Sequence, residues 1–147
     1  MIKHIKCNIF DCGVSIILHS VNCKGVMGAG LAKQIREKYP NVYSTYCKHC
    51  HDAKEPLLGS WLAVKANDGK WIINLFGQDG FGRDKRYTDY DALKKSMYGA
   101  KAALGDVPIA IPYKLGCGLG GGDWNIVYGI IEEVFGDNES DVLICEI

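Results

Sequence analysis

Two glycine-rich segments are the parts of this sequence best suited to hold a ligand. Residues 116–122 read Gly-Cys-Gly-Leu-Gly-Gly-Gly, and Asp123 and Trp124 follow at the start of an amphipathic run that ends at Phe135. Residues 25–30 read Gly-Val-Met-Gly-Ala-Gly and also lie between an apolar run and a helix-like segment. Glycine lacks a Cβ atom, so such loops let backbone N–H groups approach a ligand, and a following helix N-terminus favours phosphate. Two loops of this kind predict a diphosphate ligand, and the alternative is a pair of flexible turns.

Two titratable residues lie beside these loops. His19 precedes the first loop by a few residues, and histidine suits general acid–base chemistry because its pKa lies near neutrality. A histidine at the end of a strand can instead be a buried structural group. Asp123 follows the second loop, and a residue directly before a helix is more typical of an N-cap than of a catalytic carboxylate.

A cysteine- and histidine-rich segment offers a different chemistry. Residues 47–51 read Cys-Lys-His-Cys-His, which is the spacing of a c-type haem attachment and provides four side chains of the kind that bind zinc. Haem attachment takes place in exported proteins, and the sequence has no apolar signal core. A closed zinc site needs another ligand pair at comparable spacing, which is absent. We therefore expect a polar helix end here, and we expect neither a metal nor a cofactor.

Length and composition fit a small enzyme or binding module. A chain of 147 residues predicts one domain over residues 1–147, and such a chain can bury roughly 70% of its unfolded surface. The 17 basic and 17 acidic residues balance without forming blocks, so we expect no nucleic acid polymer as partner. The longest aliphatic stretch, Val14 to Leu18, is too short for a bilayer, so we expect no membrane partner and a cytoplasmic location. The seven cysteines are then expected to be reduced thiols.

Apolar periodicity predicts alternating strands and helices along nearly the whole chain. Residues 67–69 read Asn-Asp-Gly, which predicts the turn of an antiparallel hairpin. Thr88 to Asp91 have the spacing of a capping box before a helix. The predicted strands are 14–18, 60–66, 70–76, 108–111 and 142–145. The predicted helices are 31–39, 42–51, the helix that follows the capping box and runs to about 104, and 125–135. This order predicts a layered α/β domain with a mixed sheet and with both glycine loops at the carboxyl ends of strands, where ligands bind in open sheets.

Two other phosphate-binding folds do not fit the loops. A P-loop requires Gly-x-x-x-x-Gly-Lys followed by Ser or Thr, and the sequence contains no such run. A dinucleotide-binding fingerprint requires Gly-x-Gly-x-x-Gly and an acidic residue about 20 positions on. The first loop reads Gly-x-x-Gly-x-Gly instead, and the region near 47–50 is not acidic.

Three segments together resemble the macro domain: Asn8 to Phe10, His19 to Ala32, and Leu115 to Trp124. The similarity spans nearly the whole chain, and within the family it is greatest to the yeast-type ADP-ribose-1''-phosphate phosphatases and the related terminal ADP-ribose protein glycohydrolase. The resemblance implies a single macro domain with a three-layer α/β/α fold. It also implies an ADP-ribose cleft, with the first loop near the distal ribose and the second over the diphosphate.

The resemblance further implies roles for individual residues. Asn8 stands where many family members have an aspartate that accepts a hydrogen bond from adenine, and its amide oxygen can also accept one. The pattern of His19 and Asn22 is similar to the phosphatase branch, which implies that Asn22 holds the distal ribose hydroxyls. His19 would then donate a proton to the departing oxygen or position water, and Phe76 would line the ribose pocket. The remaining expected ligand contacts are Ile9, Ser20, Val21, Met27, Gly28, Ala29, Gly30, Leu31, Ala32, Leu115, Gly116, Cys117, Gly118, Leu119, Gly120 and Gly121.

The sequence departs from the glycohydrolase branch at two places. That branch uses a lysine nucleophile after the hairpin, where residues 77–82 of this chain contain no lysine. It also uses an aspartate in the second loop, where this chain has Gly120. Lys85 lies near enough in sequence to keep a lysine mechanism open. We therefore expect a hydrolase that removes phosphate from ADP-ribose 1''-phosphate. The alternatives are an ADP-ribose-binding module without turnover, a hydrolase that removes ADP-ribose from protein, and a nucleotide-dependent enzyme of another fold.

Overall fold

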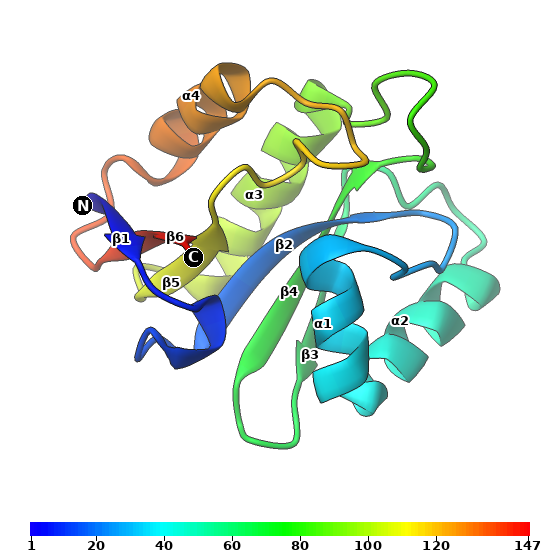
Figure 1. Cartoon of the computed structure of the whole chain (residues 1–147), viewed down its shortest axis with the longest axis horizontal. Coiled ribbons are helices and arrows are strands. Elements are labelled where there is room, and N and C mark those ends of the chain that lie inside the picture. The colour runs from blue at the N-terminus through cyan, green and yellow to red at the C-terminus, as the bar shows by residue number, and fades with distance from the viewer.

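A computed structural model describes all 147 residues as a six-stranded sheet between two pairs of helices (Figure 1). The sheet order is β1-β6-β5-β2-β4-β3. All neighbouring strands are parallel except β3, which pairs antiparallel with β4. The mixed sheet and the antiparallel hairpin are therefore confirmed. The strands are β1 (Ile2–Lys6), β2 (Ile16–Asn22), β3 (Trp61–Lys65), β4 (Trp71–Gln78), β5 (Ile109–Pro112) and β6 (Val142–Glu146).

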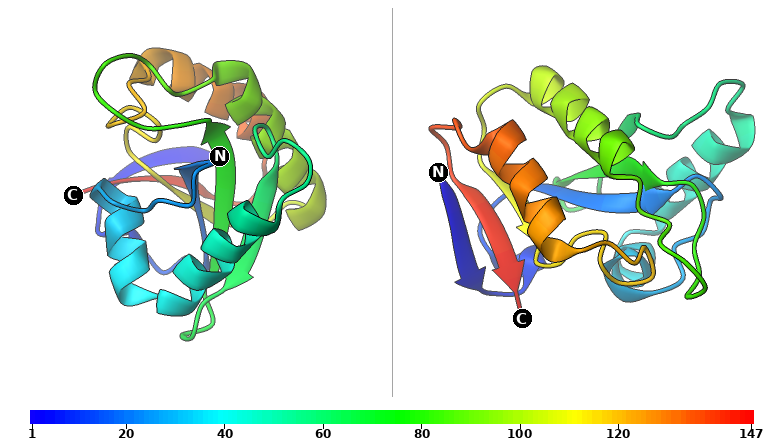
Figure 2. Two further views of the ribbon diagram at one scale, coloured as in Figure 1. Left: turned by 90° about the vertical axis from the view of Figure 1, so that its right-hand side faces the viewer. Right: turned by 90° about the horizontal axis from the view of Figure 1, so that it is seen from above.

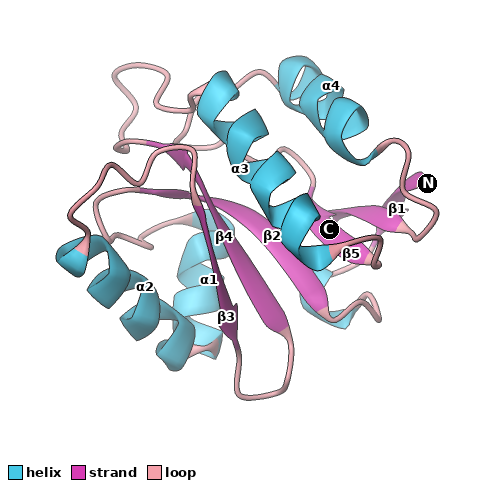
Figure 3. Cartoon of the chain, turned by 180° about the vertical axis from the view of Figure 1, so that it is seen from behind, coloured by secondary structure: helices cyan, strands magenta, loops and turns pink.

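The helices form the outer two layers. Helices α1 (Gly30–Lys38) and α2 (Pro40–Asp52) cover one face of the sheet, and α3 (Tyr90–Leu104) and α4 (Trp124–Phe135) cover the other, as Figures 2 and 3 show from further sides. Side chains of a strand alternate between faces, so Ile17 and Val21 join the core under α1 and α2 while Leu18 joins the core under α3 and α4. The predicted three-layer α/β/α fold is thus confirmed.

Helix ends follow local capping chemistry, with one difference from the sequence prediction. The N-cap of α3 is Asp89, whose carboxylate accepts a hydrogen bond from the backbone N–H of Ala92 at 3.0 Å. Thr88 is not the cap, because its buried hydroxyl donates to the backbone oxygen of Gly116 at 2.7 Å. Asp123 caps α4 as predicted by accepting from the N–H of Asn125 at 2.8 Å. Thr88 therefore ties the loop before α3 to the second glycine loop.

The sequence prediction missed strand β1 and began β2 too early. β1 has only two apolar residues, Ile2 and Ile5, between Lys3, His4 and Lys6, and lies at the edge of the sheet. It pairs with β6 at the other end of the chain, which a local pattern cannot indicate. No helix of the structure has both the length and the apolarity that a membrane span requires.

Candidate ligand-binding cleft

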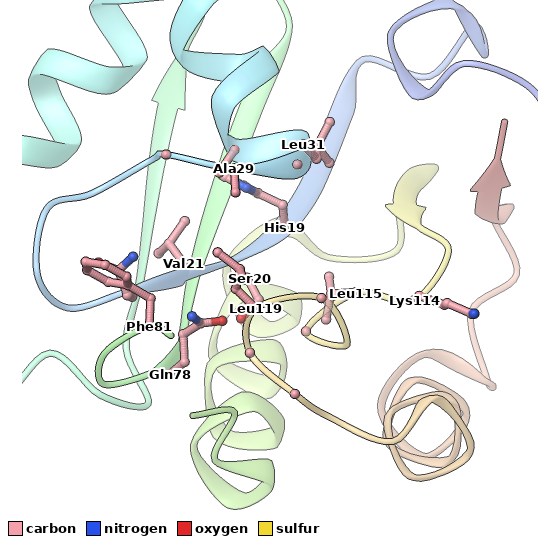
Figure 4. A pocket seen from close by; sticks show the side chains of 18 of the residues that line it. His19, Ser20, Val21, Ala29, Leu31, Gln78, Phe81, Lys114, Leu115 and Leu119 are labelled. Carbon is pink, nitrogen blue, oxygen red and sulfur yellow. The ribbon is translucent and has the colours of Figure 1, made fainter. Parts of the chain in front are cut away.

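A cleft of about 870 Å³ opens at the carboxyl ends of β2, β4 and β5. Both glycine loops border it, although about 90 residues separate them in the chain, and Figure 4 shows them on either side of the end of β2. The structure thus brings most of the predicted ligand residues together. Those that line the cleft are His19, Ser20, Val21, Asn22, Gly28, Ala29, Gly30, Leu31, Ala32, Leu115, Gly116, Gly118, Leu119, Gly120 and Gly121.

Five predicted ligand residues do not line the cleft. The amide oxygen of Asn8 caps the short 3₁₀ helix Ile9–Asp11 by accepting from the N–H of Phe10 at 3.0 Å. Ile9, Met27 and Phe76 are buried in the core beneath α1 and α2. The thiol of Cys117 lies against the backbone oxygen of Leu115.

The cleft contains three cationic side chains and no acidic one. Arg83 and Lys85 come from the segment between β4 and α3, and Lys114 follows β5. No Asp or Glu is among the lining residues, so the charge of the cleft favours an anionic ligand. The sequence indicated Lys85 alone, by its distance along the chain from the expected lysine, and Arg83 and Lys114 were missed because only the folded chain places them beside the glycine loops. The other lining residues that sequence reasoning missed are Val26, Gln78, Phe81, Gly82, Pro112 and Tyr113.

The N-terminus of α1 adds unpaired backbone N–H groups to this candidate anion-binding site. The N-cap, Ala29, has no side chain that can accept from the first turn, and Gly30, Leu31 and Ala32 all line the cleft. The first N–H groups of a helix have no partner within the helix, and they carry the positive end of its dipole. An uncapped end that faces a cleft is suited to bind a phosphate.

The second glycine loop is held in a fixed shape by the segment before α3. The backbone N–H groups of Tyr87 and Thr88 both donate to the oxygen of Gly120, at 2.8 and 2.9 Å. A Cβ atom on Gly120 would lie 2.7 Å from the oxygen of Gly116 and closer still to the hydroxyl of Thr88. Glycine is therefore required at this position by packing, which also means that no aspartate fits there.

Gln78 occupies the base of the cleft at the end of β4. Its amide donates to the backbone oxygen of Gly80 at 3.0 Å, and its Oε1 lies 2.9 Å from where a Cβ on Gly120 would stand. The base of the cleft thus holds a neutral amide beside a glycine. Lys85 lines the cleft further out, with its Nζ 4.9 Å from the centre of the Tyr87 ring.

His19 lies at the bottom of the cleft and is only 2% exposed. Its Nε2 is 2.7 Å from the side-chain oxygen of Asn74 on β4. Burial lowers the pKa of His19 from 6.5 to about 4, and the hydrogen bond to Asn74 opposes that shift only in part. The ring is therefore neutral at physiological pH. A neutral imidazole whose N–H already bonds to Asn74 is a poor proton donor, so these surroundings argue against the expected general-acid role.

Asn22 holds the first glycine loop together. Its side-chain nitrogen donates to the backbone oxygen of Val26 at 2.8 Å, and its side-chain oxygen accepts from the N–H of Lys24 at 2.9 Å. The hydroxyl of Tyr46 lies 2.9 Å from the same oxygen. The amide that was expected to hold ribose hydroxyls is thus already paired within the protein, and it shapes the loop instead.

Ser20 contributes a hydroxyl that lacks a partner. Its Oγ is buried and makes no hydrogen bond within the chain, and the residue lines the cleft. Buried polar atoms are almost always paired, and this hydroxyl is an exception: it is covered from solvent beside Gly77, where an added Cβ would stand 2.8 Å from it.

The cysteine- and histidine-rich segment forms the last turns of α2, as expected of a polar helix end. Cys47 turns towards the first glycine loop, with its thiol 3.3 Å from the oxygen of Gly25. His51 points outward and pairs with Asp52 at 3.1 Å. Cys50 lies on the same side as Cys47, 3.7 Å from where a Cβ on Gly25 would stand, whereas His51 points away from both. No group of three or more His, Cys, Asp or Glu side chains in the structure has metal-site geometry.

Comparison with known proteins finds one family match and several similar proteins. The family model described as Macro domain matches residues 18–131. An ADP-ribose 1''-phosphate phosphatase of Meyerozyma guilliermondii is 31% identical over 124 residues, which cover 72% of this chain and 71% of that protein. A DNA ADP-ribosyl glycohydrolase of Mycobacterium tuberculosis is 30% identical over 130 residues, 86% of this chain but only 36% of that protein. The solved structure of Thermosipho africanus DarTG in complex with ADP-ribose has a TM-score of 0.82 at 25% identity, over 98% of this chain and 41% of that chain.

Proposed function

The chain belongs to the macro domain family, and we propose that its cleft binds ADP-ribose and hydrolyses an ADP-ribose derivative. The observation that carries this proposal is the charge and shape of the cleft, in which two glycine loops meet an uncapped helix N-terminus and which three cationic residues and no acidic one line. A diphosphate matches these donors. The names of the fungal and mycobacterial relatives and the ADP-ribose in the Thermosipho structure support the same ligand.

The substrate that we favour is ADP-ribose 1''-phosphate. Its additional phosphate needs positive charge beyond the diphosphate site, and Arg83 and Lys85 provide it on the same wall of the cleft. The fungal relative bears the name of this phosphatase. Removal of ADP-ribose from a protein by the lysine and aspartate of the glycohydrolase branch is disfavoured, because Gln78 fills the base of the cleft and Gly120 admits no side chain.

The reaction would transfer the terminal phosphoryl group to water. Water attacks phosphorus, the bond between phosphorus and the anomeric oxygen breaks, and the proton that water releases ends on the leaving oxygen. Backbone N–H groups, Arg83 and Lys85 would offset the negative charge on the phosphate oxygens. His19, neutral at the bottom of the cleft, would position the water rather than supply a proton.

A binding module without turnover is the second candidate. It is favoured by the absence of a carboxylate from the cleft and by the hydrogen-bonded, neutral state of His19, since ADP-ribose binding needs neither an acid nor a base. De-ADP-ribosylation is a third candidate, because the mycobacterial relative is named as a glycohydrolase. Lys85 is the lysine of this chain that could serve such a reaction.

One set of assays separates these candidates. The protein is incubated in parallel with ADP-ribose 1''-phosphate, a mono-ADP-ribosylated protein and ADP-ribosylated DNA, while calorimetry measures its affinity for ADP-ribose. We expect inorganic phosphate to be released from the first substrate. If the protein released ADP-ribose from the modified protein or the modified DNA and no phosphate from the first substrate, its function would be de-ADP-ribosylation. If it bound ADP-ribose and formed no product from any substrate, it would be a binding module.

A further inference from the structure

Asn74 and His19 form a buried polar pair between two neighbouring strands. They are register partners on β4 and β2, and both side chains point to the face beneath α1 and α2, opposite to Leu18 and Leu75. Asn74 is fully buried and His19 nearly so. Their contact, 2.7 Å between Oδ1 and Nε2, is therefore shielded from water, and each group depends on the other.

The orientation of the Asn74 amide is fixed by a third residue. Its side-chain nitrogen donates to the backbone oxygen of Leu62 on β3 at 3.0 Å. A carbonyl oxygen can only accept, so the nitrogen of the amide must face Leu62 and the oxygen must face His19. Because an amide oxygen can also only accept, Nε2 of His19 must carry a hydrogen.

This assignment determines what His19 presents to the cleft. A neutral imidazole carries one hydrogen, so with Nε2 protonated its Nδ1 is left with a free lone pair. His19 lines the cleft beside Ala29 and Leu31, and Figure 4 shows its ring extending from β2 towards Ala29. With Nε2 turned to Asn74, Nδ1 is the only polar atom of the side chain that remains for a bound molecule.

We propose that Asn74 is a positioning residue that holds His19 as a hydrogen-bond acceptor, with Nδ1 receiving the O–H of the water that attacks the substrate. The acceptor state of His19 follows from the geometry of the free protein. The role of the water rests on the proposed function. Neither residue needs to change its charge during turnover, which suits two side chains that are buried in the fold.

The nitrogens of His19 provide a test that does not depend on activity. In protein with ¹⁵N-labelled histidine, long-range ¹H–¹⁵N correlation spectra at neutral pH distinguish protonated from unprotonated ring nitrogens. We expect His19 to show a protonated Nε2 and an unprotonated Nδ1. A protonated Nδ1, whether in the other tautomer or in the charged ring, would overturn the proposal even if the enzyme proved active.

The variant Asn74→Asp tests the link to turnover. A carboxylate in place of the amide stabilises the imidazolium, so Nδ1 gains a hydrogen and can no longer accept. We expect kcat to fall by about 10²-fold, while the Kd for ADP-ribose changes by less than about threefold because its diphosphate contacts lie elsewhere. The matched control is Asn41→Asp, since the amide nitrogen of Asn41 also donates to a backbone oxygen of β3, that of Lys65 at 3.0 Å, far from the cleft.

The outcomes of these experiments are distinguishable. If the wild-type protein binds no ADP-ribose or releases no phosphate, the proposed function is wrong. The histidine spectra then still test whether Asn74 holds His19 with an unprotonated Nδ1. An active wild type whose Asn74→Asp variant keeps full kcat, with the Nδ1 of His19 protonated in its spectrum, contradicts the positioning role. If the variant does not fold, the wild-type spectrum decides the acceptor state by itself.

Discussion

The hydroxyl of Tyr46 on α2 donates to the backbone oxygen of Asn22 at 2.7 Å and lies 2.9 Å from the side-chain oxygen of the same residue. Tyr46 is fully buried and stacks on Phe76 of β4, with ring centres 6.0 Å apart. Tyr46, a core residue, thus fixes Asn22, which ends β2 just before the first glycine loop. The shape of one wall of the cleft therefore depends on a helix that does not line it.

Removal of this hydroxyl should loosen the first glycine loop. We expect Tyr46→Phe to lower the free energy of unfolding by about 1 kcal/mol and to weaken ADP-ribose binding, because the amide and carbonyl of Asn22 lose their anchor. Tyr39→Phe is the matched control, since the hydroxyl of Tyr39 bonds to Asp68 at 2.6 Å beside the β3–β4 turn. Denaturation and calorimetry on both variants would show a loss of affinity only for Tyr46→Phe. If both variants bound ADP-ribose with the same affinity, the hydroxyl of Tyr46 would have no role in binding.

Bulky residues on the open glycines of the two loops should block the ligand without disturbing the fold. A Cβ on Gly118 would meet no atom within 4 Å, and one on Gly28 only Val26 at 3.5 Å. We expect Gly28→Leu and Gly118→Leu to abolish ADP-ribose binding in calorimetry while their circular dichroism stays native. Gly129→Leu, on the exposed side of α4 with no atom near its Cβ, serves as the control that should bind normally. Unchanged affinity in both loop variants would place the ligand elsewhere.

Gly120 should tolerate even one methyl group poorly. Its Cβ would stand 2.7 Å from a backbone oxygen, that of Gly116, and such overpacking costs about 1–3 kcal/mol. We expect Gly120→Ala to lower the unfolding midpoint in urea, whereas Gly118→Ala should change stability by less than about 1 kcal/mol. If the two variants were equally stable, the second loop would be less tightly held than the bonds from Tyr87 and Thr88 indicate.

The buried histidine should give stability a definite pH dependence. The pKa of His19 is about 4 in the folded protein and 6.5 in the absence of burial, so between these values the unfolded chain binds a proton that the folded chain does not. The free energy of unfolding is therefore not reduced by this proton above about pH 6.5. As the pH falls from 6.5 towards 4, the free energy of unfolding decreases by about 3 kcal/mol. Urea denaturation from pH 7 to pH 4.5 measures this slope. His19→Gln should flatten it, and an equal slope in the variant would assign the effect to other groups.

The features predictable from the sequence are those with local causes. Both glycine loops, the cap at Asp123 and the hairpin turn at 67–69 depend on neighbouring residues, and all are present in the structure. Strand β1 was not predictable, because it is a strand only through its pairing with β6.

The errors in the site have long-range causes. Phe76 was expected to touch the ligand, but it is buried in the core, where Tyr46 stacks on it. Asn22 lines the cleft as expected, and its side chain is also held by Tyr46, 24 residues further along the chain. Arg83 was not expected in the cleft and Lys85 was left open, because hydrogen bonds from Tyr87 and Thr88 to Gly120, far along the chain, bring their segment there. Packing partners distant in the chain decide which side chains face the ligand.

A crystal structure of the protein with ADP-ribose tests the central claim most directly. We predict that the diphosphate lies between the two glycine loops, within hydrogen-bond distance of backbone N–H groups at the start of α1 and in residues 116–121, with Nδ1 of His19 facing a water or hydroxyl of the ligand. A nucleotide bound outside this cleft, or one whose diphosphate touches neither loop, would contradict the account.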